Sequence, residues 1–264
     1  MYTNKDHTFI VCAYGDSPYL EQCVKSLVAQ TIDSRILMST STPNDSIQSI
    51  AKKYNIPIYI NDGKPSISHD WNCALSHCDT SLATIAHQDD IYLSNYVSCM
   101  LDSMNSAPNP LIFFSNYGEL RDGEQVDSSL ILNVKRFLLR GIESSGYCDS
   151  FRNKRRLISF GSSICCPSVT FNLNSLPSPV FLDNMKCDLD WEAWERFSRL
   201  DGSFVYSDEI LMRHRIHEGS ETTASIEDDT RRREDLEMLF KFWPKPVAIL
   251  LNAVYSMSMK SNSI

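Results

Sequence analysis

The chain has 264 residues, of which 42% are hydrophobic and 22% are charged, which is ordinary for a folded globular protein. Its length suffices for one large α/β domain with a small appendage, and its formal charge of −8 argues against a nucleic-acid partner, which normally meets a basic face. Nine cysteines without a CxxC pair fit reduced thiols in a cytoplasmic protein. No apolar run reaches the roughly 18 residues that a membrane span needs.

The first hundred residues alternate apolar strand patterns with helical patterns. The expected strands cover residues 8–13, 35–39, 56–60 and 81–87, and the expected helices cover residues 18–28, 45–54, 68–77 and 93–104. Ser17 is expected to cap the first helix, with Pro18 in its first position. Such alternation is typical of βαβ units around a parallel sheet. We therefore interpret residues 1 to about 105 as a nucleotide-binding half.

His87-Gln88-Asp89-Asp90 follows the last of these expected strands. Ligands of open α/β sheets bind beyond the carboxyl ends of the strands, so polar residues at this place are functional candidates. Carboxylate oxygens suit Mg²⁺ or Mn²⁺, which commonly bridges one or two carboxylates to substrate phosphates. The alternative is an Asp-Asp turn that starts the helix of residues 93–104, because aspartate is favoured at helix N-termini.

The segment from residue 105 to 186 carries weaker signals. We expect a strand over residues 111–115, an exposed polar excursion over 116–127 with a turn at Asp122-Gly123, and a helix over 130–140. Residues 152–156, Arg-Asn-Lys-Arg-Arg, form the sharpest charge run. They are either a solvated face or a site for an acceptor diphosphate, because guanidinium groups pair with phosphate oxygens.

A helix is expected near residues 186–200, with an apolar stripe of Cys187, Trp191, Trp194 and Phe197 that suits core packing. Asp190 lies at the edge of this stripe, in the first turns. A helix N-terminus favours its ionised form, whereas packing near tryptophan raises its pKa, so its surroundings could tune it as a general base. Asp188 is the alternative base.

The last segments begin with a strand over residues 209–215, followed by His217. The loop of residues 218–223 could close as a lid. A charged amphipathic helix is expected over 227–243. The apolar tail of residues 246–259 is too short to span a bilayer and could pack on the domain, dimerise or lie on a membrane surface.

Five motifs, in this order, resemble family-2 glycosyltransferases of the GT-A fold. They lie at residues 10–31, 68–75, 87–90, 190–197 and 211–217, and the match covers about residues 7–223. The resemblance implies an α/β fold with a Rossmann-like, mostly parallel central sheet flanked by helices. It implies a transferase domain over residues 1–223, with an acceptor half over about 106–223, and leaves residues 224–264 as a C-terminal helical extension.

The resemblance also implies an activity: a metal-dependent inverting glycosyltransferase. Such an enzyme would move a sugar from a nucleotide-sugar donor, here a uridine diphosphate sugar, to a saccharide acceptor carried on a lipid diphosphate in cell-surface polysaccharide synthesis. It would work in the cytoplasm, at the inner face of the membrane. Mn²⁺ or Mg²⁺ would be held by Asp89 together with Asp90 or His217, and Asp190 would be the base. His217 is either a metal ligand or a contact of the donor diphosphate. The residues that would contact the donor are Ala13, Tyr14, Asp16, Ser41, Asn72, His87, Gln88 and Asp89.

Two positions depart from the family pattern. The loop of residues 40–44, Thr-Ser-Thr-Pro-Asn, lacks the acidic pair that usually meets the nucleotide base. His87 replaces the first acidic residue of the metal motif, and it either contacts a ribose hydroxyl or phosphate, or bonds to the backbone. These departures leave a non-catalytic, sugar-nucleotide-binding partner of another transferase as the alternative. A nucleotidyltransferase would need a Gly-rich phosphate loop, which residues 14–17 do not form.

Overall fold

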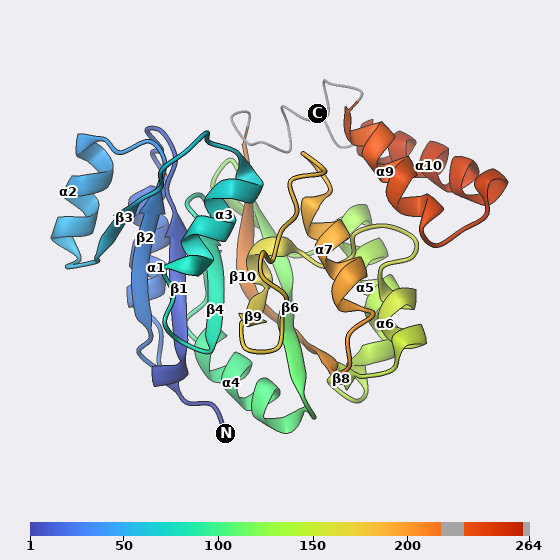
Figure 1. Cartoon of the computed structure of the whole chain (residues 1–264), viewed down its shortest axis with the longest axis horizontal. Coiled ribbons are helices and arrows are strands. Elements are labelled where there is room, and N and C mark those ends of the chain that lie inside the picture. Colours follow the sequence, from blue (N-terminus) through green and yellow to red (C-terminus); the bar gives the residue numbers. More distant parts are fainter. Residues whose placement is uncertain (218–229, 261–264) are drawn as a thin grey trace.

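The computed structural model describes residues 1–217 and 230–260, which form a curved central sheet with helices on both faces (Figure 1). The sheet runs in the order β3-β2-β1-β4-β9-β6-β10-β5, with β7 beside β6 and β8 beside β10. Its strands are β1 (His7–Cys12), β2 (Arg35–Thr40), β3 (Ile58–Ile60), β4 (Leu82–His87), β5 (Ile91–Tyr92), β6 (Pro110–Arg121), β7 (Glu124–Val126), β8 (Tyr147–Cys148), β9 (Thr170–Asn172) and β10 (Ser203–Ile216).

The N-terminal half is built from parallel βαβ units, as the sequence predicts. β3, β2, β1 and β4 pair in parallel, and α1 (Leu20–Val28), α2 (Asp45–Lys53) and α3 (Ile67–Ser76) connect them. β1 and β4 are buried along almost their whole length, because helices cover both of their faces. Their carboxyl ends therefore meet at one edge of the sheet.

The second half is joined to the first through the short antiparallel strand β9, which lies between β4 and β6. β6 and β10 then pair in parallel over their length. Around them lie α4 (Tyr96–Ser106), α5 (Leu130–Glu143), α6 (Phe151–Leu157) and α7 (Leu189–Phe197). Two short 3-10 helices, η1 (Asn4–Asp6) and η2 (Cys166–Ser168), precede β1 and β9. The two halves thus share one mixed sheet.

The exposed excursion predicted for residues 116–127 is wrong. β6 continues to Arg121, since Tyr117 and Leu120 are buried and the strand pairs with β10 there. The turn at Asp122-Gly123 is confirmed, with φ angles of 49° and 87° at the two residues, and it leads into β7. The polar residues of this segment belong to a hairpin and not to a loop.

The predicted start of the first helix is also wrong. α1 begins at Leu20 after a turn, and Ser17 does not cap it: the Ser17 Oγ accepts a hydrogen bond of 3.3 Å from the Tyr19 backbone N–H. Tyr19 instead contacts residues at the end of β10, described below. Asn44, which was not predicted as a cap, does cap α2, because its side chain accepts a hydrogen bond from Ile47 N–H.

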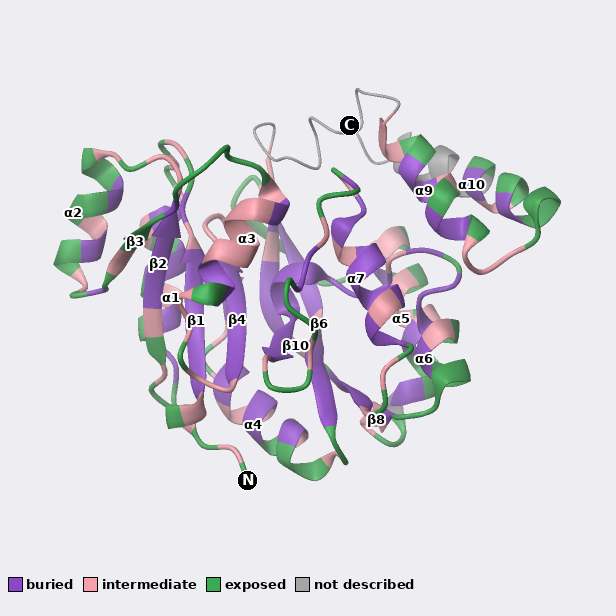
Figure 2. Cartoon of the chain, viewed as in Figure 1, coloured by how far each residue is buried: buried purple, intermediate pink, exposed green. Residues whose placement is uncertain are grey.

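Apolar side chains on the two faces of the sheet form two cores. Figure 2 shows that the strands in the middle of the sheet are mostly buried. Alternate residues of β1 divide between them: Ile10 packs in one core, whereas Phe9 and Val11 pack in the other. Trp191 and Trp194 of α7 are almost fully buried in the first core, which confirms the apolar stripe predicted for this helix. The packing of these tryptophans therefore holds the part of α7 that carries Asp190.

The C-terminal helices α9 (Thr230–Phe240) and α10 (Lys245–Lys260) pack beside α7 (Figure 1). The Phe242 ring stacks on Trp191 at 6.2 Å between centroids, and Trp243 Nε1 donates to the Ser159 carbonyl at 2.7 Å. The predicted lid, residues 218–223, lies outside the described residues. None of the helices in the described segments is long and apolar enough to cross a membrane.

Candidate active site

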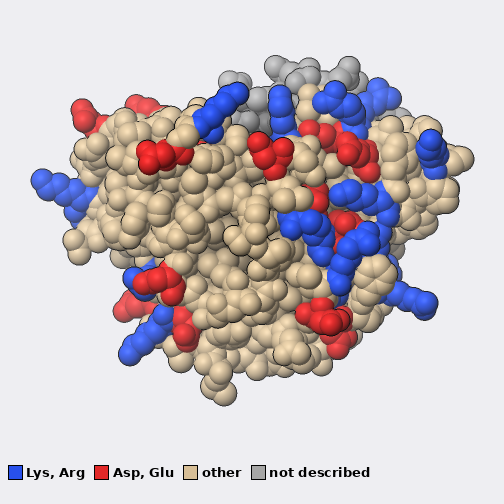
Figure 3. Space-filling view, in the orientation of Figure 1, with Lys and Arg blue, Asp and Glu red and all other residues tan. Residues whose placement is uncertain are grey.

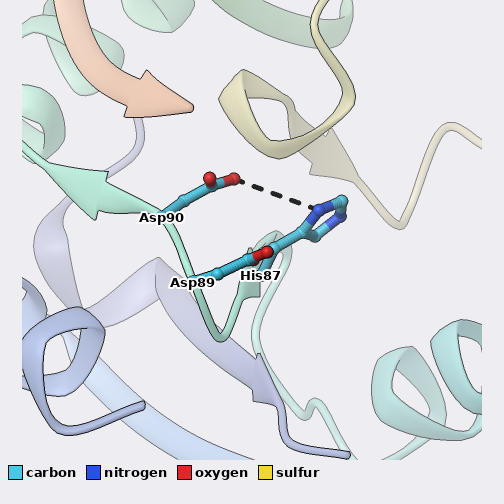
Figure 4. A group of neighbouring side chains, drawn as sticks. All are labelled: His87, Asp89 and Asp90. Carbon is cyan, nitrogen blue, oxygen red and sulfur yellow. Dashed lines mark ion pairs between the residues drawn. The ribbon is translucent and has the colours of Figure 1, made fainter. Parts of the chain in front are cut away.

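The turn after β4 brings three potential metal ligands together. His87 ends β4, and a backbone hydrogen bond of 3.2 Å from Asp90 N–H to the His87 carbonyl closes the turn. The His87 ring and the Asp90 carboxylate point toward each other, with 4.0 Å between Nδ1 and Oδ2 (Figure 4). One ligand atom from each of His87, Asp89 and Asp90 lies within 4.8 Å of the others. The group could therefore hold one divalent cation.

The end of β10 completes this group from 125 residues further along the chain. Asp90, which is fully buried, accepts hydrogen bonds at its Oδ1 from Arg215 N–H at 2.8 Å and from His214 Nδ1 at 3.1 Å. His217 Nε2 lies 3.0 Å from Asp89 Oδ2. His217, predicted from the sequence as a metal ligand, is thus brought next to the metal motif. His214 was part of a predicted motif but had no assigned role.

The surroundings of these groups set their protonation. Burial lowers the pKa of His87 despite the nearby charges of Asp90 and Asp89, so the ring is neutral and offers a nitrogen lone pair. Burial acts to raise the pKa of Asp89, but His87, His217 and His214 outweigh it and the pKa lies below its usual value. An ionised carboxylate beside a neutral imidazole is a donor set that Mn²⁺ accepts readily.

Arg215 connects the turn of residues 87–90, called the metal turn below, to the start of α1. Its Nε donates to the Asp89 carbonyl at 2.8 Å, its Nη2 donates to Gln22 Oε1 at 2.7 Å, and its guanidinium lies 4.2 Å from the centre of the Tyr19 ring. The His217 ring also packs against the Tyr19 ring, with 5.0 Å between the ring centroids. A hollow of about 500 Å³ opens here beside His217. The turn is therefore held rigidly, with open space next to it.

Two residues predicted to contact the donor use their side-chain amides within the protein. Gln88 accepts from Tyr14 N–H at 2.9 Å and donates to the Tyr14 carbonyl at 3.0 Å. Asn72 makes the same paired contact with the backbone of Phe181, at 3.1 and 2.7 Å. Donor contact by either residue stays a prediction. In the structure, both side chains hold the backbone of neighbouring loops.

The remaining predicted donor residues lie along the same edge of the sheet. Ala13 is buried directly after β1, whereas Tyr14 and Asp16 in the following loop are exposed. Ser41 follows β2, and its Oγ donates to Asp70 Oδ2 at 3.0 Å. Asn61, which follows β3, donates to Asp70 Oδ1 at 3.1 Å.

Asp70 therefore supplies a carboxylate to the loop of residues 40–44, which has none of its own. It comes from the first turn of α3, whereas the family pattern places the acidic residues in the loop itself. No local sequence pattern marks Asp70, since its contacts are with Ser41 and Asn61 on two other connections.

Asp190 stands half-buried in the first turn of α7. Its Oδ1 accepts a hydrogen bond of 2.6 Å from Trp191 N–H. Burial raises the pKa of Asp190, and that hydrogen bond and the charges of Arg231 and Lys135 offset only part of the effect. Asp190 is thus a carboxyl with an enhanced affinity for a proton, and it lies near His87.

Asp188, the alternative base, is only 1% exposed. Burial and the adjacent Asp235 raise its pKa well above the usual value. Of the two carboxyl groups, Asp190 is the one that a substrate can reach. Lys135 and Arg231, whose charges act on Asp190, lie on α5 and α9, and no local sequence pattern connects them to it.

The basic run of residues 152–156 forms most of α6 and does not act as one site. Lys154 is fully buried and donates to the carbonyls of Leu200 and Gly202 at 2.5 and 2.7 Å. Arg155 pairs with Glu195. Arg152 and Arg156 are exposed. The prediction of a solvated face is therefore wrong for Lys154 and Arg155, which hold α6 to the core.

A family model described as glycosyl transferase family 2 matches residues 8–158, more than half of the chain. The chain belongs to this family. It is therefore a glycosyltransferase, and the curved sheet with its flanking helices is the GT-A fold that the sequence predicts. No curated protein matches the chain by sequence.

Solved structures match this glycosyltransferase over nearly its whole length at low identity. S. aureus TarS 1–349 in complex with UDP-GlcNAc has 16% identity and a TM-score of 0.60, over 95% of this chain and 71% of that one. The mannosyltransferase PcManGT from Pyrobaculum calidifontis, with GDP-Man and Mn²⁺, has 10% identity and a TM-score of 0.66, over 98% and 76%. Glucosyl-3-phosphoglycerate synthase from Mycobacterium tuberculosis, with Mn²⁺ and UDP-Glc, has 10% identity and a TM-score of 0.57, over 89% of this chain and 79% of that one.

Proposed function

We propose that this glycosyltransferase moves a sugar from a nucleotide-sugar donor to a hydroxyl group of a saccharide acceptor, with inversion at the anomeric carbon. The observation that carries the proposal is the convergence of the His87-Asp89-Asp90 group with Asp190, an accessible carboxyl of raised pKa. These are the two chemical functions that such a transfer needs: a place for the diphosphate and a base for the acceptor.

The donor diphosphate belongs at the metal turn. Asp89 would hold Mn²⁺ or Mg²⁺ there, together with His87, Asp90 or His217, whose ligand atoms lie around it. A cation in that site would neutralise the charge of the departing nucleoside diphosphate. Support comes from the solved structures of the same fold, two of which hold Mn²⁺ with a nucleotide sugar. Asp70 could accept the imide N–H of a uracil base, so we propose a uridine diphosphate donor.

Asp190 acts as the general base. Its carboxylate takes the proton of the acceptor hydroxyl while that oxygen attacks the anomeric carbon and the bond to the nucleotide oxygen breaks. A single in-line displacement of this kind inverts the configuration. The raised pKa of Asp190 makes it a better proton acceptor than an ordinary aspartate.

We place the acceptor at a membrane surface, as a lipid diphosphate saccharide. A hollow of about 260 Å³ lies between α5 and α6, and its lining residues are Phe137, Leu138, Arg140, Arg156 and Phe160. Phe137 is 62% exposed and Phe160 is 43% exposed. Figure 3 shows Lys and Arg side chains gathered over the half of the molecule that holds α6, α7 and α9, although the chain carries a net charge of −8. Exposed rings beside arginines suit an anionic lipid bilayer.

Calorimetric binding of uridine, thymidine and guanosine diphosphate sugars, with and without Mn²⁺, tests the proposal on wild type, Asp89→Ala and Asp190→Asn. We expect Mn²⁺-dependent binding of one nucleotide class, its loss in Asp89→Ala and its retention in Asp190→Asn. Transfer of labelled sugar should fall about 10²- to 10⁴-fold in Asp190→Asn, because the base is removed while the donor site is intact.

Asp201→Asn, an exposed aspartate in the connection before β10, is the control and should transfer normally. Unchanged turnover in Asp190→Asn would remove Asp190 from the mechanism. A folded wild-type protein that binds none of these nucleotides would contradict the donor site.

A further inference from the structure

The N-terminus of α7 is held by a residue of the C-terminal helix α9. Asp188 precedes α7 but its side chain forms no capping hydrogen bond. Instead, Glu234 of α9 accepts from Cys187 N–H at 2.8 Å and from Asp188 N–H at 3.2 Å, and Lys186 N–H donates to both of its oxygens at 3.0 and 3.1 Å. Glu234 is 6% exposed. A buried carboxylate thus satisfies three successive backbone donors at the entry to α7.

A second contact joins the same two helices. Asp188 and Asp235 are 1% and 3% exposed and form a hydrogen-bonded carboxyl pair. Burial and the charge of Asp235 raise the pKa of Asp188, so the two carboxyl groups act on each other across the contact between α7 and α9. Arg231, also on α9, lies 4.0 Å from Asp188. The first turn of α7 is therefore fixed by a buried set of charged groups from α9.

Asp190 belongs to this same turn, two residues after Asp188. The charge of Arg231 also acts on Asp190, so this residue of α9 lies near the candidate base. The segment before α7, residues 182–188, has no regular secondary structure of its own. Without Glu234, the backbone there would lose its acceptors, and the direction in which Asp190 points would be less well defined.

We infer that α9 is a positioning element of the active site, in which Glu234 and Asp235 hold the first turn of α7 so that Asp190 faces the acceptor hydroxyl. The inference rests on the proposed role of Asp190 as the base. It gives the C-terminal extension a part in the transfer reaction itself. Glu234 is a positioning residue and not a catalytic one, since it contacts backbone groups only.

The first test compares Glu234→Gln with Glu237→Gln, which changes an exposed glutamate of the same helix. We expect kcat of Glu234→Gln to fall about ten- to a hundredfold, because a small displacement of a reacting group costs that much. The KM for the donor should stay unchanged, since the metal turn lies elsewhere. Glu237→Gln should match wild type. A normal kcat in Glu234→Gln would overturn the inference.

The carboxyl pair allows a rescue experiment. Asp235→Asn can still hydrogen-bond to Asp188 and should keep most of the activity, whereas Asp235→Ala should lose it to the same extent as Glu234→Gln. Equal losses in Asp235→Asn and Asp235→Ala would mean that the pair itself does not position the turn.

A double variant separates positioning from general loss of structure. If Glu234 acts through Asp190, then Glu234→Gln/Asp190→Asn should transfer sugar no more slowly than Asp190→Asn alone. Additive losses would overturn the inference. Amide hydrogen exchange of residues 186–191 gives a readout without activity and should speed up in Glu234→Gln but not in Glu237→Gln. If Asp190→Asn alone transfers normally, the proposed base fails, while the exchange experiment still reports whether Glu234 holds the turn.

Discussion

Asp89 and Asp90 are neighbours in sequence but have different surroundings. The side chain of Asp89 is 20% exposed and borders His217, whereas that of Asp90 is fully buried. Asp90 also accepts the backbone N–H of Arg215 and so joins the turn after β4 to the end of β10. Asp89 is therefore free to meet a ligand, and Asp90 belongs to the framework of the site as well as to its ligand group.

We predict that Asp90→Ala lowers the free energy of unfolding by about 1–3 kcal/mol, because the buried N–H of Arg215 loses its acceptor. Asp89→Ala should cost much less, since Asp89 is partly exposed, and it serves as the control. Urea unfolding of the two variants at neutral pH is the measurement. Equal losses in both would show that Asp90 has no special structural part.

Sequence reasoning found the site residues that carry a local pattern. Asp89 stands at the end of an apolar strand, and Asp190 stands beside an apolar helical stripe, so both could be chosen from their neighbours in sequence. Asp70, Lys135 and Arg231 act through contacts with residues that are distant in sequence, and these depend on how connections and helices pack. A single sequence does not encode such contacts in any nearby spacing.

At the scale of elements, helix periodicity divides the basic run of residues 152–156. Lys154 lies on the buried face of α6 and donates to two carbonyls of the connection between α7 and β10. Arg152 and Arg156, four positions apart, lie on the exposed face. A Cβ atom at Gly141 of α5 would collide with the guanidinium of Arg156. The exposed face of α6 and the facing side of α5 therefore form one surface.

We predict that this surface binds anionic bilayers. Wild type should co-sediment with vesicles containing phosphatidylglycerol and not with pure phosphatidylcholine vesicles. Arg140→Gln/Arg156→Gln should bind about thirtyfold more weakly, because about 1 kcal/mol is lost for each of the two basic residues. Added salt should weaken the binding of wild type. Lys52→Gln/Lys64→Gln, which removes two exposed charges from α2 and from the connection after β3, is the matched control. Equal binding of the two double variants would contradict the prediction.

The same scale explains which elements the sequence predicted well. The βαβ units of the first half have strong periodic patterns, and α5 and α7 have clear apolar stripes. β6 could not be predicted beyond residue 115, since its polar residues face partners on β10 and β7 that are close only in the folded sheet. The start of α1 was misplaced because Tyr19 is held by Arg215, which is nearly 200 residues away.

At the scale of the whole molecule, His7 ties stability to pH. It is fully buried in β1, between Ser34 Oγ at 2.7 Å and Thr84 Oγ1 at 2.9 Å, and burial lowers its pKa from 6.5 to about 3. The unfolded chain takes up a proton below pH 6.5, but the folded chain does not do so until about pH 3. The stability contributed by neutral His7 is therefore complete above pH 6.5 and is lost as the pH falls toward 3.

We predict that the free energy of unfolding of wild type falls by about 1.4 kcal/mol per pH unit more steeply than that of His7→Gln between pH 6 and pH 4. Urea unfolding at several pH values is the measurement. His69→Gln, which changes a histidine near the surface on α3, should keep the slope of wild type. Parallel curves for wild type and His7→Gln would show that His7 titrates normally in the folded protein.

The pairing of Asp90 with Arg215 has a consequence for synthesis of the chain. The ribosome makes the whole metal motif before the second half exists, yet Asp90 gains its hydrogen-bond partners only when β10 has been translated and has paired with β6. Until then a carboxylate that ends fully buried stays exposed to water. The turn after β4 is thus translated early, but it reaches its final arrangement only after β10 has been made and has joined the sheet.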